Sequence, residues 1–123
     1  MFSMCMKEVN LKVKLVSDED NIDTIIKGYK INNKIIYQEN DIEVVVIINN
    51  DNIFMERKGM DYHISLNFEK DNQTISTYQV FGGLKIFELE TITKKLNITN
   101  KRIEINYNLE GNNFSYLLEM EDL

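Results

Sequence analysis

The sequence contains no proline, tryptophan or alanine, and it has one cysteine, Cys5, and one histidine, His63. A single cysteine cannot form a disulfide within the chain. One histidine and one cysteine also cannot build the ligand cluster of a zinc site, so we expect neither a metal nor a cofactor. Because alanine is the strongest helix former, its absence argues against a helical fold.

Long apolar runs are missing as well. No stretch approaches the roughly 20 apolar residues of a membrane helix, and the apolar opening, residues 1–6, is too short for a signal-peptide core. The formal net charge of −6 repels polyanions, so nucleic acid and anionic membranes are disfavoured as partners. We expect a cytoplasmic protein, and its 123 residues predict one domain spanning 1–123.

The sequence does show an alternation of apolar and polar side chains. Ile103, Ile105, Tyr107 and Leu109 alternate with polar residues, and residues 114–120 repeat the pattern after a turn at Gly111. This alternation is typical of strands with one buried and one solvated face. Clusters of Asn, Asp and Gly, which tolerate the positive φ angles of tight hairpins, separate such runs. The predicted strands are 7–17, 22–31, 34–40, 42–49, 52–58, 60–69, 73–81, 84–98, 102–110 and 113–121.

Short connections between these strands predict a meander, in which sequence neighbours pair. A single sheet of about nine or ten strands curls, and closure removes its exposed edges. We therefore predict an all-β fold, a single antiparallel meander β-barrel of calycin or lipocalin type, with a two-sheet sandwich as the alternative. The strand 84–98 is expected to bend or bulge in the middle, Gly82-Gly83 to form a hairpin or bulge, and residues 18–23 to form an acidic loop.

Several short motifs follow one another between Gly28 and Leu96. After Gly28 come Tyr37-Gln38-Glu39 at a strand end, Ile53-Phe54-Met55 and Arg57-Lys58-Gly59 at a hairpin, Tyr78 with Gly83, and Thr91 with Thr93. In this order and spacing the stretch resembles an uncharacterised bacterial family of calycin-like β-barrels, the YwiB type. The resemblance implies a barrel of ten or a similar number of strands, related in shape to lipocalins and fatty-acid-binding proteins, and it implies no activity.

Arg57 is the main candidate for a functional residue. It has the same parity as Ile53 and Met55, so it is expected to point into the barrel. A buried guanidinium must be paired, and its fork suits a carboxylate or an anionic ligand. Glu39 or Glu88 could be an internal partner, and a ligand carboxylate or phosphate could replace it. A purely structural ion pair and a solvent-facing arginine are the competing interpretations.

Two non-enzymatic functions follow from this fold. In the first, the barrel binds a small apolar or amphipathic anion, with Arg57 as anchor next to Glu39, and Tyr37, Tyr78 and Tyr107 as the wall. Tyrosines give a pocket bulk with a polar tip, although they also fill ordinary cores. In the second, the barrel is filled and acts as a protein-interaction module or homodimer. The run 42–48, apolar on both faces apart from Glu43, supports this second hypothesis because its outer face needs cover.

An enzyme is the least favoured hypothesis, and no catalytic residue is assigned. Its acid or base would be Glu39, Glu88 or Glu90. The last two would lie inside the barrel if Leu84 and Ile86 faced inward, but we favour an inner face formed by residues 85, 87 and 89. His63 falls on the polar face of its strand and is expected to face solvent. The apolar residues 1–6 could plug one barrel end or form a dimer contact.

Overall fold

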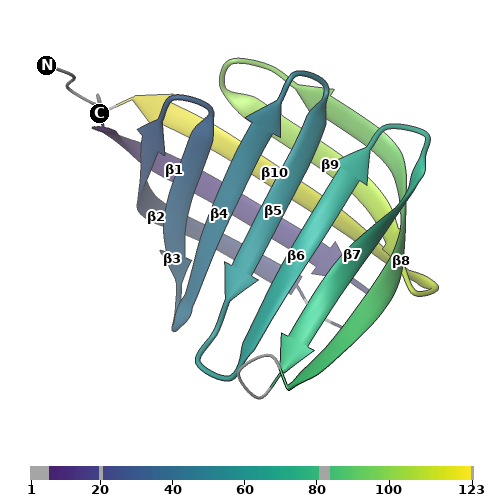
Figure 1. Ribbon diagram of the computed structural model, residues 1–123. Helices are drawn as coiled ribbons and strands as arrows, with labels where there is room; N and C mark the ends of the chain where they lie inside the picture. The colour runs from purple at the N-terminus through teal and green to yellow at the C-terminus, as the bar shows by residue number, and fades with distance from the viewer. Residues whose placement is uncertain (1–5, 20, 81–83, 123) are drawn as a thin grey trace, which may run out of the picture.

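The computed structural model describes residues 6–19, 21–80 and 84–122, and within them every regular element is a strand (Figure 1). The predicted strands are confirmed, with bounds within about two residues of those expected from the alternation. The strands are β1 (Met6–Ser17), β2 (Asn21–Ile31), β3 (Lys34–Glu39), β4 (Ile42–Asn49), β5 (Asn52–Lys58), β6 (Tyr62–Glu69), β7 (Gln73–Val80), β8 (Lys85–Ile98), β9 (Arg102–Leu109) and β10 (Asn112–Asp122).

The strands form one closed barrel in which each strand pairs with its sequence neighbours. The last strand closes the barrel by pairing antiparallel with the first, from Val9 opposite Asp122 to Ser17 opposite Phe114. The predicted meander barrel is therefore confirmed, and the two-sheet sandwich is not formed. Closure by β1 and β10 also places the two ends of the described chain beside each other (Figure 1).

The interior of the barrel is filled by the inward-facing residue of each alternating pair. Tyr37, Tyr116 and Phe68 are among the largest fully buried side chains. Packed around them are aliphatic residues from β1, β3, β4, β5, β9 and β10, including Leu11, Ile35, Val46, Ile53, Ile103 and Leu118. Burial of these apolar surfaces is the main source of stability for the fold.

The turns follow the predicted chemistry for the most part. Asn32, Asn40, Asn50 and Asp71 all have positive φ angles, as tight reversals between strands require. The bulge expected in the long strand is confirmed as a register shift between Thr93 and Lys95. The acidic loop is partly wrong, because residues 21–23 already belong to β2 and pair with β1. Gly82-Gly83 and residues 1–5 lie outside the described residues.

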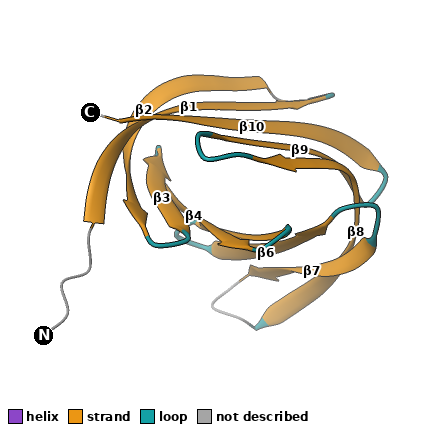
Figure 2. Ribbon diagram, turned by 90° about the horizontal axis from the view of Figure 1, so that it is seen from above, coloured by secondary structure: helices purple, strands orange, loops and turns teal. Residues whose placement is uncertain are grey.

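Two stretches of the barrel have a strand partner on one side only. β2 pairs with β3 over Gly28–Ile31, so residues 21–27 have β1 as their one strand partner among the described residues. β8 pairs with β9 only from Thr91 onward, so residues 85–89 have β7 as their one strand partner among the described residues. Such stagger accompanies the tilt of strands in a closed barrel. Among the described strands, β8 approaches only β6, β7 and β9, and Figure 2 shows it on the side of the barrel away from β1 and β2.

Candidate functional site

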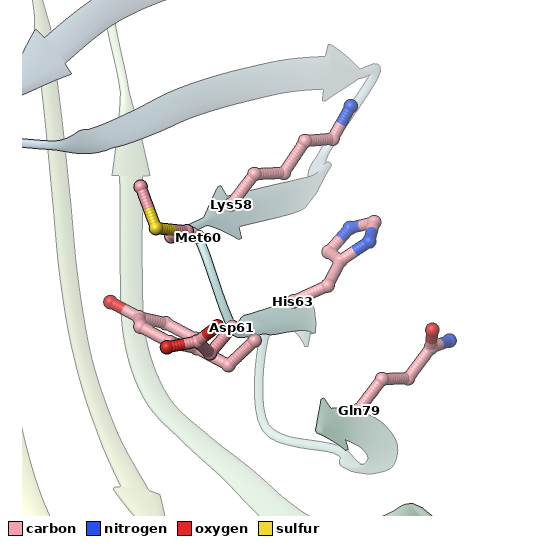
Figure 3. Close-up of a pocket in the computed structure, with 7 residues that line it drawn as sticks. Lys58, Met60, Asp61, His63 and Gln79 are labelled. Atoms are coloured by element: carbon pink, nitrogen blue, oxygen red, sulfur yellow. The ribbon is translucent and has the colours of Figure 1, made fainter. Parts of the chain in front are cut away.

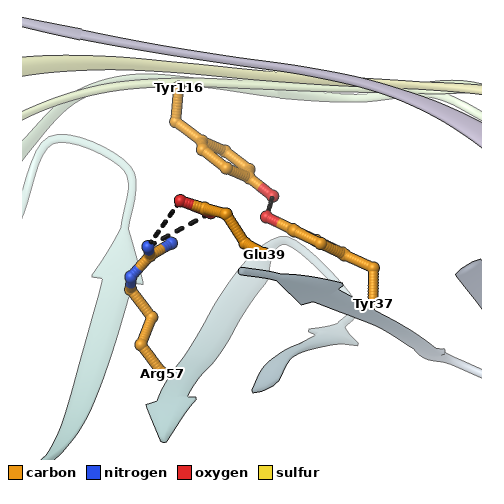
Figure 4. Close-up of polar contacts among 4 residues, drawn as sticks. All are labelled: Tyr37, Glu39, Arg57 and Tyr116. Atoms are coloured by element: carbon orange, nitrogen blue, oxygen red, sulfur yellow. Dashed lines mark hydrogen bonds and ion pairs between the residues drawn. The ribbon is translucent and has the colours of Figure 1, made fainter. Parts of the chain in front are cut away.

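Arg57 and Glu39 form a buried ion pair near one end of the barrel. Glu39 ends β3 and Arg57 lies near the end of β5, with β4 between them. The guanidinium Nη2 donates to both carboxylate oxygens, at 3.0 and 3.2 Å (Figure 4). The side chains are 14% and 8% exposed. The inward position expected for Arg57 is therefore observed, and Glu39 is its partner.

The environment of this pair favours the charged guanidinium. Burial alone would lower the pKa of Arg57, because it removes water from the cation. The hydrogen bonds and negative charge of Glu39 outweigh that effect and raise the pKa of Arg57 above its ordinary value. The pair is therefore a permanent charge-assisted contact, which fixes the end of β3 against β5.

A pair of tyrosines joins the opposite walls of the barrel next to this ion pair. The hydroxyl of Tyr37 on β3 lies 2.8 Å from the hydroxyl of Tyr116 on β10 (Figure 4). Burial raises the pKa of Tyr37 to about 12 and that of Tyr116 well above its ordinary value. Burial also raises the pKa of Tyr107 to about 12. All three hydroxyls therefore stay neutral at ordinary pH, and those of Tyr37 and Tyr116 hydrogen-bond to each other in the core.

The five residues predicted to form a ligand site fall into two groups. Arg57 donates hydrogen bonds to Glu39, and its positive charge partly offsets the burial that raises the pKa of Tyr37 and of Tyr107. Arg57 on β5 pairs opposite Ile64 on β6, and Ile64 pairs opposite Tyr78 on β7. Ile64 therefore separates Tyr78 from Arg57. The structure thus brings four of the five together and leaves Tyr78 in a different environment.

Tyr78 belongs to an aromatic cluster at the barrel end. The rings of Tyr78 and Tyr62 are parallel, with centroids 6.1 Å apart. The centroid of the Phe87 ring lies 6.2 Å from that of Tyr78. Phe87 is 50% exposed although its parity places it on the inner face. The reason is that β8 at this level has no β9 neighbour to cover it. The half-exposed cluster is a product of strand stagger, which residue parity cannot reveal.

A second buried polar group was missed by sequence reasoning. The hydroxyls of Ser76 and Thr91 lie 2.7 Å apart with both residues fully buried. Thr93 lies beside them along β8, and its Oγ1 has no hydrogen-bond partner among the described residues. The parity of Thr91 and Thr93 with Leu89 was a usable signal, but a threonine fits a strand on either face.

The structure gives no support for a deep cavity at Arg57. Of the five hollows described, none is lined by Tyr37, Glu39 or Arg57. One hollow of about 310 Å³ lies at the β5–β6 turn, where Lys58, His63 and Gln79 point to one side and Met60 to the other (Figure 3). Another, of about 730 Å³, lies over β1 and β10 and includes Lys12 and Glu119. All are surface features.

The remaining candidate residues lie on the outside of the barrel. Glu88 and Glu90 are exposed, with Leu89 between them turned inward, so Glu88 as an internal partner of Arg57 was a wrong alternative. The favoured inner face of β8 is observed in part, because Leu89 is half-buried in line with the buried Thr91, whereas Lys85 and Phe87 on the same face are exposed. His63 lies on the outer face, where its Nε2 is 2.7 Å from Glu56 Oε2. Glu39 is buried with Arg57, whereas Glu88 and Glu90 are exposed on the outer face of β8.

The outer face of β4 keeps the apolar character that the sequence suggested. Val45 and Ile47 point outward and are partly exposed. Among the described strands, β4 contacts only β3 and β5, so no further layer covers this face. In the described chain no three His, Cys, Asp or Glu residues gather as metal ligands. The same residues include no helix with the length and apolarity needed to cross a membrane.

These features define a closed antiparallel meander β-barrel of ten strands with a side-chain-filled interior. The chain belongs to the family described as a domain of unknown function (DUF1934), whose pattern matches residues 8–119. The crystal structure of the ywiB protein from Bacillus subtilis is similar, with a TM-score of 0.70 and 21% identity, covering 96% of this chain and 93% of that one. The resemblance to the YwiB type is therefore confirmed. No curated protein matches the chain.

Proposed function

We propose that this protein is a non-enzymatic interaction module that binds another protein through the β7–β8 end of its filled barrel. The observation that carries this proposal is the β8 stretch from Lys85 to Leu89, which has a strand neighbour on one side only. Exposed sheet edges invite pairing with another chain. A module that binds through such an edge requires no internal cavity, in agreement with the packed core.

Exposed apolar side chains at the same place support this function. Leu84 is 86% exposed, Ile86 59% and Phe87 50%, and all three lie within four consecutive residues. Ile86 lies on the outer face of β8 and Phe87 on the inner face, so apolar side chains are exposed on both sides of this stretch. Exposed apolar side chains gathered in one place mark an interaction site more often than single exposed residues do. The outer face of β4 offers a second apolar surface, but its residues are only partly exposed.

A comparison of two surface variants tests this function. The L84S/I86T double variant, called the hairpin variant below, removes apolar surface at the start of β8. Tyr29→Thr serves as the control, because it removes a 43%-exposed side chain where β2 pairs with strands on both sides. Tagged chains would be purified from the source cells, and the bound proteins quantified by mass spectrometry. We expect the hairpin variant alone to lose its bound partner, by about tenfold.

Two further results of that comparison are informative. Equal recovery of bound proteins with all three chains would contradict the proposal. A dimer of the wild-type chain in light scattering, dissociated by the hairpin substitutions and not by Tyr29→Thr, would identify the partner as a second copy.

A small amphipathic anion is the second candidate function, and one observation favours it. Both hydrogen bonds from Arg57 to Glu39 use Nη2, so Nε and Nη1 bond to no carboxylate among the described residues. A ligand carboxylate could contact that edge of the guanidinium. Native mass spectrometry of the purified protein checks this candidate. A bound acid lost from Arg57→Gln would support it, and a ligand-free mass in the wild type would contradict it.

A further inference from the structure

We propose that the partner contributes an extended segment with basic residues at alternate positions, which pairs antiparallel with the open edge of β8 at Ile86 and Glu88. This inference rests on the proposed function and specifies the partner's chemistry. It combines the direction of the backbone groups, the exposure of the neighbouring side chains and the charge on the outer face.

The hydrogen bonds at Glu90 fix the direction of the backbone along this edge. Where β9 ends, the N–H of Glu110 donates to the carbonyl of Glu90 at 3.0 Å. The N–H of Glu90 in turn donates to the side-chain Oε2 of Glu110 at 2.6 Å. Both backbone groups of Glu90 therefore point away from β7, and the Glu110 carboxylate takes the place of a missing strand partner.

The same direction applies to Glu88 and Ile86, because backbone groups alternate sides along a strand. The β7–β8 ladder is continuous from Gln73 opposite Ile92 to Val80 opposite Lys85, so no bulge changes this alternation. Beyond the reach of Glu110, no described strand lies beside these two residues. Their N–H and C=O groups form a short edge where one added strand would make paired hydrogen bonds.

Side chains on the two faces of this edge differ in character. Ile86, Glu88 and Glu90 face outward with Glu110 close by, whereas Phe87 and Leu89 face inward. Within the described chain, none of the three glutamates forms an ion pair. A strand with basic residues on its outer face and apolar residues on its inner face would match both surfaces.

A second copy of the chain fits this edge less well than a basic segment. Antiparallel pairing of two β8 edges would bring the same three carboxylates from both copies onto one outer face. The net charge of each chain, −6, adds a general repulsion. Charge complementarity therefore points to a basic partner, and self-association becomes an outcome that the test can detect.

The test uses a fluorescent peptide of alternating lysine and valine as the probe, with binding followed by anisotropy. In an antiparallel pair, residues that exchange hydrogen bonds have side chains on the same face. The lysines opposite Ile86 and Glu88 would therefore carry the bonded N–H groups. N-methylation of the lysines should abolish binding, whereas N-methylation of the valines blocks only the far edge and should leave it intact.

Charge variants provide the second arm of the test. Glu88→Lys should weaken binding of the lysine peptide by about tenfold and improve binding of a glutamate–valine peptide. Glu121→Lys, an equal charge change on an exposed β10 residue, serves as the control and should shift affinity by less than about twofold. Failure of the lysine peptide to bind, or equal binding by both N-methylated peptides, would overturn the inference. Self-association of the chain that Glu88→Lys abolishes would also overturn it.

The two proposals can fail separately. If the hairpin variant loses its bound protein but the lysine peptide does not bind, the interaction module stands and strand addition is wrong. If the hairpin variant keeps its bound protein, the proposed function itself is wrong.

Discussion

Tyr37 and Tyr116, 79 residues apart in the sequence, meet with their hydroxyl oxygens 2.8 Å apart across the interior of the barrel. The contact joins β3 to β10, which are not neighbours in the sheet. Both side chains are fully or almost fully buried. A buried hydroxyl that loses its partner costs free energy, so this pair ties the two walls of the barrel together.

Removal of one hydroxyl should lower the free energy of unfolding, because the other hydroxyl is left buried without its partner, whereas removal of both leaves no unpaired group. We expect Tyr37→Phe to lower the free energy of unfolding by about 1–3 kcal/mol, because the hydroxyl of Tyr116 is left unpaired. The Y37F/Y116F double variant should lose less than the sum of the single variants. Urea denaturation of the four proteins in this cycle measures the coupling, and strictly additive losses would show that the two hydroxyls do not interact.

Breaking the ion pair of Arg57 and Glu39 should lower the free energy of unfolding more than removing a tyrosine hydroxyl does. Arg57→Met leaves a buried carboxylate without its cation, and we expect a loss of about 3–5 kcal/mol in unfolding free energy. A combined Arg57→Met and Glu39→Leu replacement should recover part of it, because no buried charge remains. Chemical denaturation measures these losses. An Arg57→Met variant as stable as the wild type would contradict the burial of the ion pair.

The buried tyrosines predict a loss of stability in alkali. In the unfolded chain a tyrosine ionises near pH 10, whereas the pKa values of Tyr37 and Tyr107 in the fold are about 12. Between these values the unfolded state binds fewer protons, so stability falls as pH rises. Each of the two tyrosines contributes about 3 kcal/mol that is present below pH 10 and lost by about pH 12.

Unfolding free energies measured from about pH 10 to pH 12 check whether stability falls as the pH rises. Tyr107→Phe should show a shallower decline than the wild type, because one of the groups that ionises on unfolding is gone. A stability that stayed constant from about pH 10 to pH 12 would contradict the burial of these hydroxyls.

Gly28 is expected to be intolerant of any side chain. A Cβ atom at this position would lie 2.5 Å from Leu11 Cδ1 and 2.7 Å from the backbone oxygen of Ile36. The backbone oxygen cannot move without disturbing the β2–β3 ladder. We expect Gly28→Ala to lower the unfolding free energy by about 1–3 kcal/mol, measured by thermal or urea denaturation. An alanine variant of wild-type stability would show that β2 can shift away from β3.

The alternation of side chains was sufficient to predict the strands, the barrel and the inward position of Arg57, because parity assigns each residue to a face. Parity does not reveal which inward residues meet. It left Glu39 and Glu88 as alternative partners for Arg57, and it could not foresee the contact of Tyr37 with Tyr116, which depends on barrel closure. It also could not locate the open edge of β8, which is set by the register between strands.

Two sequence signals overlap at residues 22 and 23, where alternation predicts a strand and acidic composition predicts a loop. The acidic character of the stretch from Asp18 suggested a loop, yet Asn21 and Asp23 pair opposite Val16 and Lys14 of β1. Strand pairing at this point overrides the weak intrinsic preference of Asp and Asn for turns, because the β1–β2 ladder continues to the turn.

Amide hydrogen exchange of the free protein along residues 85–89 tests directly whether the edge of β8 is open. We expect an alternating pattern: slow exchange at Lys85, Phe87 and Leu89, whose N–H groups face β7, and fast exchange at Ile86 and Glu88, which face the open edge. Uniformly slow exchange at all five amides would show that the edge is already covered and would contradict the proposed binding edge.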